Sequence, residues 1–177
     1  MLSIAIAMAV GASLLGFASV VGAQTSPPRF RELPKDGMTD AQKRVYDAIA
    51  GGPRGSVRGP FAVLLRSPEL ADRVQKLGEH LRFNSTLPPR LNEFAILINA
   101  RFWGSKYEWY AHRSLARKSG LAESIADDVA NGQRPAGMKD DEALVFDFCS
   151  VLHRQHFVTT RSSSARCPPW ASRVWWT

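Results

Sequence analysis

The sequence predicts an all-α fold, on three observations. From about residue 31 onward, apolar residues recur at spacings of three and four, as on the buried face of a helix. Glycine and proline stand where these periodic segments stop. No segment keeps the two-residue alternation and β-branched enrichment of strands. Because 45% of the 177 residues are hydrophobic and 22% are charged, we expect one helical domain over residues 31–157.

The first expected helix begins at a capping box, in which Thr39 is followed three residues later by Gln42. It ends at the Gly51-Gly52-Pro53 step. Residues 54–60 contain two glycines, two arginines and a Gly-Pro step, which indicates a loop at the rim of a site. An apolar run over residues 61–65 follows this loop directly.

The second expected helix places Pro68 in its first turn, behind a Ser67 cap, and ends near Phe83. Its apolar residues are spaced four, three and four apart, as on one face of a helix, namely Leu70, Val74, Leu77 and Leu81. After two prolines, residues 91–103 are apolar nearly all round, which predicts a central buried helix. A Gly-Ser step then separates a helix over residues 107–119 from it, and the last two helices are expected over residues 121–130 and 142–157.

Both ends of the chain fall outside this domain. Residues 1–23 are apolar, carry no charged side chain and end in small residues, which predicts a signal peptide cleaved after Ala23 and an exported protein, periplasmic or secreted. An uncleaved membrane anchor is the alternative, because about 20 apolar residues can span a bilayer. Residues 24–30, with two consecutive prolines, are expected to form a disordered lead into the domain.

The last segment, residues 158–177, follows no helical period and holds three of the five Trp. Tryptophan has a single codon, so the Trp175-Trp176 pair shifted by one base encodes an aliphatic residue followed by Val. We therefore interpret this tail as the product of a frameshift. The alternative is a genuine disordered tail whose aromatic residues make interactions.

The charge of +7 does not indicate a nucleic-acid partner, because four arginines at positions 154, 161, 166 and 173 supply more than half of it. The domain itself shows no run of basic residues and no basic helix face. The two cysteines, Cys149 and Cys167, form no CxxC motif and no zinc-binding spacing. A disulfide between them is allowed but not indicated.

Candidate chemistry centres on Glu93, the one acid of the central apolar helix, which needs a partner elsewhere in space. The next helix carries Glu108 and His112 at positions i and i+4, so one carboxylate and one imidazole share a face. If that face packs on Glu93, the site holds two carboxyls and a histidine, which suffices for acid/base catalysis. Ser105, Tyr107 and Trp109 would then rim it.

Other interpretations of these residues can be set against acid/base catalysis. The Glu108 and His112 pair is equally consistent with a solvated surface pair of little energetic value. No metal is expected, because there is no HExxH motif, no second nearby histidine and no cysteine ligand. Ser105 is the one plausible nucleophile, although it lies seven residues ahead of His112 and is a weak candidate alone.

The segments from Glu93 to Leu97 and from Arg101 to His112 resemble the carboxymuconolactone decarboxylase family, and the resemblance covers about residues 31–157. It implies an orthogonal helical bundle of the alkylhydroperoxidase D-like type. In the peroxidase relatives, a Glu, a CxxC pair and a His form a proton relay at these intervals, but here Ser105 and Glu108 stand at the two cysteine positions. Without the thiols, the peroxide-reducing cycle cannot run.

The resemblance therefore favours the decarboxylase branch. It implies that His112 protonates the product carbon or stabilises an enolate, while Glu93 relays to it and Glu108 orients it. Arg58, on the glycine-containing loop, is expected to hold a substrate carboxylate, and Ser105, Tyr107 and Trp109 to bind substrate. The family also implies a small-molecule substrate, no cofactor, and a homo-oligomer, trimeric or hexameric. The alternatives are a cysteine-less peroxidase relative with another reaction and a helical binding protein without catalysis.

Overall fold

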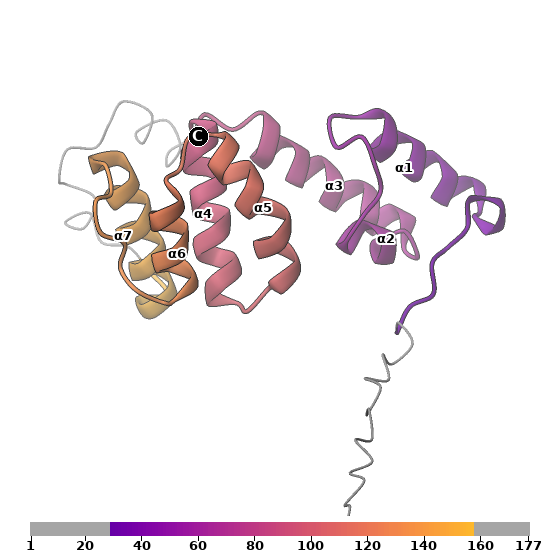
Figure 1. Cartoon of the computed structure of the whole chain (residues 1–177). Coiled ribbons are helices and arrows are strands. Elements are labelled where there is room, and N and C mark those ends of the chain that lie inside the picture. The colour runs from indigo at the N-terminus through magenta and orange to yellow at the C-terminus, as the bar shows by residue number, and fades with distance from the viewer. Residues whose placement is uncertain (1–28, 158–177) are drawn as a thin grey trace, which may run out of the picture. The chain divides into compact units, whose positions relative to one another are not determined.

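The computed structural model describes residues 29–157, and this part of the chain contains seven α-helices, one short 3-10 helix and no strand (Figure 1). The prediction of an all-α fold is thereby confirmed. After the 3-10 helix Lys35–Gly37, the helices are α1 (Asp40–Gly51), α2 (Pro60–Leu64), α3 (Pro68–Phe83), α4 (Pro89–Phe102), α5 (Lys106–Lys118), α6 (Glu123–Ala130) and α7 (Asp140–Gln155).

Local signals in the sequence set most of the helix ends. The capping box before α1 is present, because the Gln42 amide donates to Thr39 Oγ1 at 3.3 Å and the Thr39 amide donates to Gln42 Oε1 at 2.9 Å. Pro68 occupies the first turn of α3 as predicted, but the Ser67 side chain makes no capping hydrogen bond. Helix α7 begins two residues before the predicted start, since the Lys139 amide donates to the Glu142 carboxylate at 2.8 Å.

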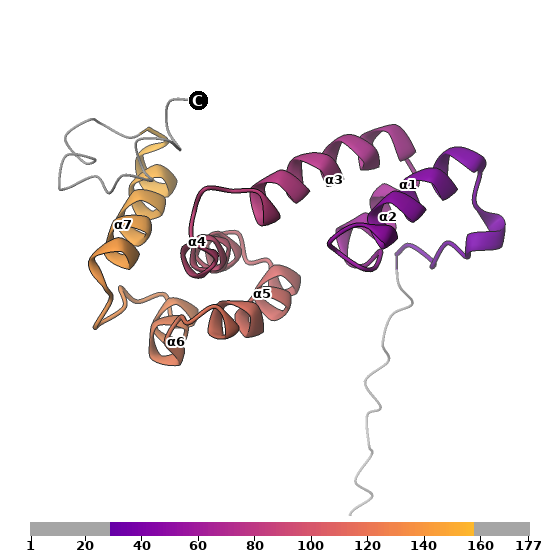
Figure 2. The same cartoon turned by 90° about the horizontal axis from the view of Figure 1, so that it is seen from above.

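Helix α4 is the centre of the larger core. Figure 2 shows α4 nearly end-on, with α5, α6 and α7 packed around it. Phe94 and Leu97 of α4 are fully buried, and Ala116 of α5, Ile125 of α6 and Val145 of α7 complete the core around them. The prediction that residues 91–103 form a central buried helix is confirmed, apart from the carboxyl-terminal end, where Phe102 and Trp103 are exposed.

Helices α1, α2 and α3 share a second, smaller core. Ile49 of α1, Ala71 of α3 and Leu65 are its most deeply buried members. The apolar run over residues 61–65, which follows the predicted loop, forms α2 and its carboxyl-terminal cap. Pro60 begins this helix directly behind Gly59, because a proline in the first turn gives up an N–H group that has no helical partner there.

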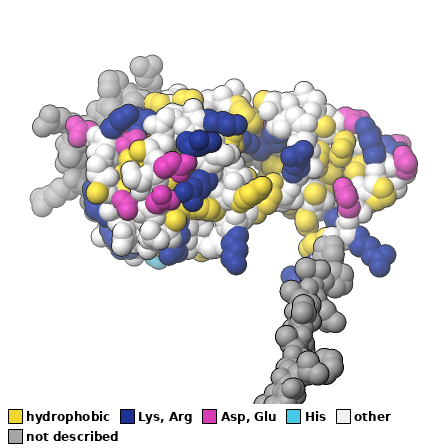
Figure 3. Space-filling view, viewed as in Figure 1, with side chains coloured by type: hydrophobic (Ala, Val, Ile, Leu, Met, Phe, Trp, Pro, Cys, Tyr) yellow, Lys and Arg dark blue, Asp and Glu magenta, His cyan; other side chains and the backbone are white. Residues whose placement is uncertain are grey.

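The apolar stripe of α3 is exposed in this structure. The side chains that predicted the helix are between 37% and 62% exposed, namely Leu70, Val74, Leu77 and Leu81. Helix α3 instead buries Ala71 and Gln75 on the face that meets α1 and α2. Hydrophobic side chains also reach the surface among charged ones on the face seen in Figure 3. The spacing of these residues correctly predicted a helix, but it did not predict whether their side chains are buried within this chain.

A buried ion-pair network connects α4 to α7. Arg90, in the first turn of α4, contacts the carboxylate of Glu142 and donates to Asp141 Oδ2 at 2.6 Å. Glu142 is 1% exposed, which makes it the most deeply buried charged residue of the part described. The network fixes the start of α7 against the start of α4.

The predictions for the signal peptide or anchor, for most of the lead and for the frameshifted tail concern residues 1–28 and 158–177, which lie outside the described part of the chain. The same holds for Cys167 and its possible disulfide. Between residues 29 and 157, no helix is long and apolar enough to cross a membrane.

Candidate functional site

The predicted acid and base meet in the structure. Glu93 on α4 and His112 on α5 are each 8% exposed, and Glu93 Oε2 lies 2.6 Å from His112 Nδ1. This contact supplies the partner that Glu93 needs among its apolar neighbours. An ionised carboxylate only accepts hydrogen bonds, so it holds the proton of the imidazole on Nδ1 and leaves Nε2 for other chemistry.

Glu108 stands on the other side of the same ring. Its Oε2 lies 3.3 Å from His112 Nε2, one helical turn away on α5, and its side chain is 37% exposed. Each ring nitrogen of His112 therefore faces a carboxylate oxygen, and the Nε2 side, beside the more exposed Glu108, is the one open to proton exchange with solvent.

A second contact to Glu93 was not predicted from the sequence. Arg82, near the end of α3, places its Nε 3.9 Å from Glu93 Oε1. Asn92 holds this end of α3 in place, because its side-chain amide donates to the carbonyl oxygens of Leu81 and Arg82 at 2.9 and 3.2 Å. The Glu93 carboxylate thus joins a guanidinium to an imidazole.

These groups border a cavity of about 1,080 Å³ between the end of α3, the loop before α2, and the facing surfaces of α4 and α5. Five of the predicted site residues line it, namely Arg58, Ser105, Tyr107, Glu108 and His112. Glu93 is not itself part of the lining and reaches the cavity through His112. Two arginines that the sequence analysis did not single out, Arg54 and Arg82, also line it.

Trp109 does not line the cavity, so the structure does not place it at the predicted rim of the site, and its role in substrate binding stays a prediction. Its side chain packs against the larger hydrophobic core, because position 109 falls on the face of α5 that carries the buried Ala116. The neighbouring Tyr110, which is 83% exposed, and Trp103 line the cavity in its place. A helical projection of residues 106–118 places position 109 away from positions 108, 111 and 115. This pattern in the sequence indicates that Trp109 lies outside the cavity.

Neither the candidate nucleophile Ser105 nor the buried Cys149 is activated. Ser105 occupies the position before α5, half-buried in the cavity wall, and no hydrogen bond joins its hydroxyl to His112 or to another base in the described residues. Burial raises the pKa of the Cys149 thiol to about 11, which keeps it protonated at neutral pH. The site is therefore suited to proton transfer rather than to covalent catalysis.

Tyr107 lies against the loop at the cavity edge. A Cβ atom built on Gly59 would overlap the Tyr107 ring and hydroxyl, so a residue without a side chain is required there. Gly59 also has φ 57°, a conformation that other residues rarely adopt. Its absent side chain lets Tyr107 pack on the backbone beside Arg58 and Pro60.

Replacing Gly59 with Ala is expected to lower the free energy of unfolding by about 1–3 kcal/mol, through backbone strain together with the displaced Tyr107 ring. Urea denaturation measures the change. Gly55→Ala is the matched control, because Gly55 has φ 69° but no atom near its missing Cβ. Equal losses for the two variants would mean that Tyr107 does not lie on Gly59.

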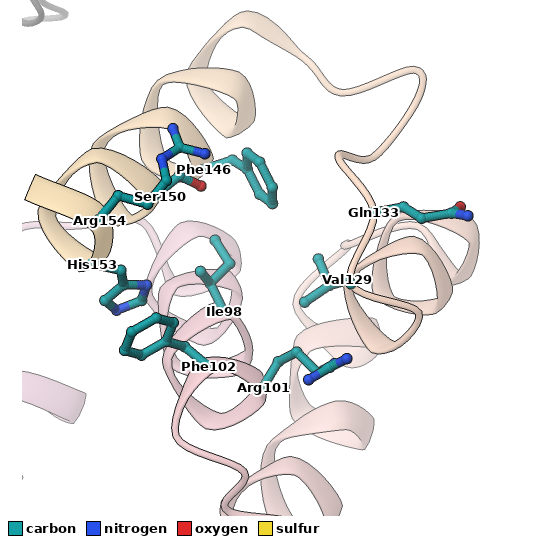
Figure 4. Close-up of a pocket in the computed structure, with 10 residues that line it drawn as sticks. Ile98, Arg101, Phe102, Val129, Gln133, Phe146, Ser150, His153 and Arg154 are labelled. Atoms are coloured by element: carbon teal, nitrogen blue, oxygen red, sulfur yellow. The ribbon is translucent and has the colours of Figure 1, made fainter.

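A second cavity, of about 350 Å³, lies between α4, α6 and α7 (Figure 4). His153 stacks on Phe102 there with ring centroids 3.9 Å apart, and its ring nitrogen lies 3.0 Å from Asn99 Oδ1. Burial lowers the pKa of His153. None of the predicted site residues lines this cavity. No group of three or more potential metal ligands within residues 29–157 is arranged to hold an ion.

The chain matches no protein-family model, no curated protein and no solved structure in the comparisons with known proteins. The geometry around His112 is therefore the basis on which a function can be proposed.

Proposed function

We propose that this protein is a cofactor-free acid/base enzyme of the decarboxylase type, acting on a carboxylated lactone or a related small acid. The observation that carries the proposal is the buried contact between Glu93 and His112 at the wall of a cavity large enough for a small molecule. The resemblance of residues 31–157 to the carboxymuconolactone decarboxylase family supports the choice of reaction.

The proposed reaction needs only proton chemistry. The bond between the substrate carbon and its carboxylate breaks, carbon dioxide leaves, and the electron pair stays on the carbon as an enolate. His112 Nε2 then delivers a proton to that carbon, and solvent replaces it through the half-exposed Glu108. Glu93 stabilises the protonated imidazole, and Arg58, which also lines the cavity, is proposed to bind a carboxylate of the substrate.

The test is decarboxylation of 4-carboxymuconolactone by the full chain, followed by absorbance, beside its His112→Ala variant. Loss of His112 is expected to reduce turnover by at least about 100-fold, the usual contribution of a general acid or base. The matched control is His80→Ala, since His80 is exposed on α3 and does not line the cavity.

No turnover by a well-folded wild-type protein would overturn the lactone assignment. Equal activity in wild type and His112→Ala would overturn the acid/base role. The first result would favour a protein that keeps this helical architecture for another reaction or for binding alone, and the second would place the chemistry on other residues of the cavity.

We also propose that the protein forms a homo-oligomer. The exposed apolar stripe of α3, formed by Leu70, Val74, Leu77 and Leu81, supports this, because a contiguous exposed apolar surface commonly marks a protein interface. Leu81 also lines the cavity, which brings one end of the stripe to the site. The family resemblance favours a trimer or a hexamer. The apolar residues 1–23 favour an exported location.

A further inference from the structure

Arg54 is the most unusual charged residue of the cavity. Its Nε is buried and has no hydrogen-bond partner, and its guanidinium forms no ion pair with a carboxylate among residues 29–157. A buried donor without a partner is rare, because leaving it unsatisfied is unfavourable. Arg54 is also one of the residues that line the cavity.

The guanidinium is held by packing rather than by charge. It lies over the Phe61 ring at 4.4 Å from the centroid and over the Phe83 ring at 5.9 Å. A Cβ atom on Gly78 of α3 would lie 2.7 Å from Arg54 Nη2, so the guanidinium occupies the space that a side chain there would fill. Aromatic rings and a glycine therefore fix the position of Arg54 while leaving its donors unused.

A second guanidinium adds positive charge at the same wall. Arg82 shares the Phe83 ring, at 4.9 Å from its centroid, and also lines the cavity. Burial, followed by the charge of Arg82, lowers the pKa of Arg54. Arg82 already faces Glu93, and the charges of Glu79 and Glu108 act on Arg54 in the opposite direction. Neither of these two carboxylates forms an ion pair with Arg54 in the described residues, so its donors are the ones left for an anion in the cavity.

We propose that Arg54 is the principal anion-binding residue of this cavity and that it receives a carboxylate group of a small organic acid, with Arg82 beside it. The cavity then holds a carboxylate-binding wall at Arg54 and a proton-transfer wall at His112. This assignment rests on the proposed function only in taking the bound acid to be the substrate. It differs from the proposal for Arg58, which is exposed on the loop.

Binding of adipate to the full chain, measured by calorimetry, tests the proposal without any turnover. The neutral diamide of adipate is the control ligand. Arg54→Gln is expected to weaken adipate binding by at least about 10-fold, as for loss of a charged hydrogen-bond donor. Arg44→Gln, an exposed position on α1 outside the cavity, controls for the change in net charge and is expected to leave binding unchanged.

Gly78→Ala is the decisive variant, because it keeps every charge but displaces the Arg54 guanidinium. Alanine stabilises a helix interior relative to glycine, so we expect an unchanged or higher Tm together with severalfold weaker adipate binding. The Nε–H resonance of Arg54 is expected to shift on adding adipate and not on adding the diamide.

Three results would each overturn the proposal: no adipate binding by the wild type at millimolar concentrations, equal binding by wild type and Arg54→Gln, or equal weakening in Arg54→Gln and Arg44→Gln. Failure of the decarboxylation assay would not affect these measurements. The two proposals therefore fail independently.

Discussion

Replacing Glu142 with Ala is expected to lower the free energy of unfolding by about 3–5 kcal/mol, the usual effect of removing one partner of a buried ion pair. Glu142 is 1% exposed, and its loss leaves the Arg90 guanidinium, which is 16% exposed, with Asp141 as its remaining partner. The same carboxylate accepts from the Lys139 amide at the start of α7, so the helix also loses its cap.

Urea denaturation followed by circular dichroism measures this change, and three variants separate its causes. Asp141→Ala, at a side chain that is 31% exposed, is expected to have an effect of about 1 kcal/mol. Glu142→Gln keeps an acceptor for the Lys139 amide but removes the charge. Replacing Arg90 and Glu142 together with Leu is expected to restore much of the stability, because it leaves no buried charge unpaired. A loss below about 1 kcal/mol for Glu142→Ala would show that the network is solvated.

The helices could be predicted because their determinants are local. The Thr39 capping box, Pro68 in a first turn and the glycines that follow α4 and α5 act within a few residues of the backbone they shape. Helix α2 was missed as a helix, since five residues are too few to show a helical period. The burial of α3 could not be predicted, because periodicity shows which residues share a face and not what covers that face.

The candidate site was predictable where a residue conflicts with its own helix. Glu93 is an acid among apolar neighbours, and its contact with His112 on the next helix follows from the adjacency of α4 and α5. Arg54 and Arg82 show no such conflict in the sequence. Arg54 follows the Gly51-Gly52-Pro53 step and Arg82 precedes Phe83, and neither setting marks the arginine as unusual. Their positions depend on how the end of α3 meets α4, which involves backbone acceptors for Asn92 rather than a sequence motif.

The contacts around His112 form one array, in which Arg82, Glu93, the imidazole and Glu108 alternate in charge when the ring is protonated. In this array each ring nitrogen faces a carboxylate oxygen, Nδ1 at 2.6 Å from Glu93 and Nε2 at 3.3 Å from Glu108. The arrangement predicts that the reaction rate depends on the negative charge of Glu93 and not only on its ability to accept a hydrogen bond.

Replacing Glu93 with Gln is therefore expected to reduce kcat on a turned-over substrate by about 100-fold with little change in KM, because Gln keeps the size of the side chain but cannot neutralise the imidazolium. Glu93 acts through His112 and is a positioning residue, so its test needs a signal from the ring itself. Nitrogen-15 spectra of the histidines are expected to show the Nδ1-protonated ring in the wild type and a mixture of tautomers in Glu93→Gln, with His112→Ala identifying the resonance. Glu69→Gln, at an acid that is 80% exposed on α3, is expected to change neither measurement. An unchanged His112 spectrum in Glu93→Gln would show that the 2.6 Å contact does not set the tautomer, and the proposed role of Glu93 would fall with it.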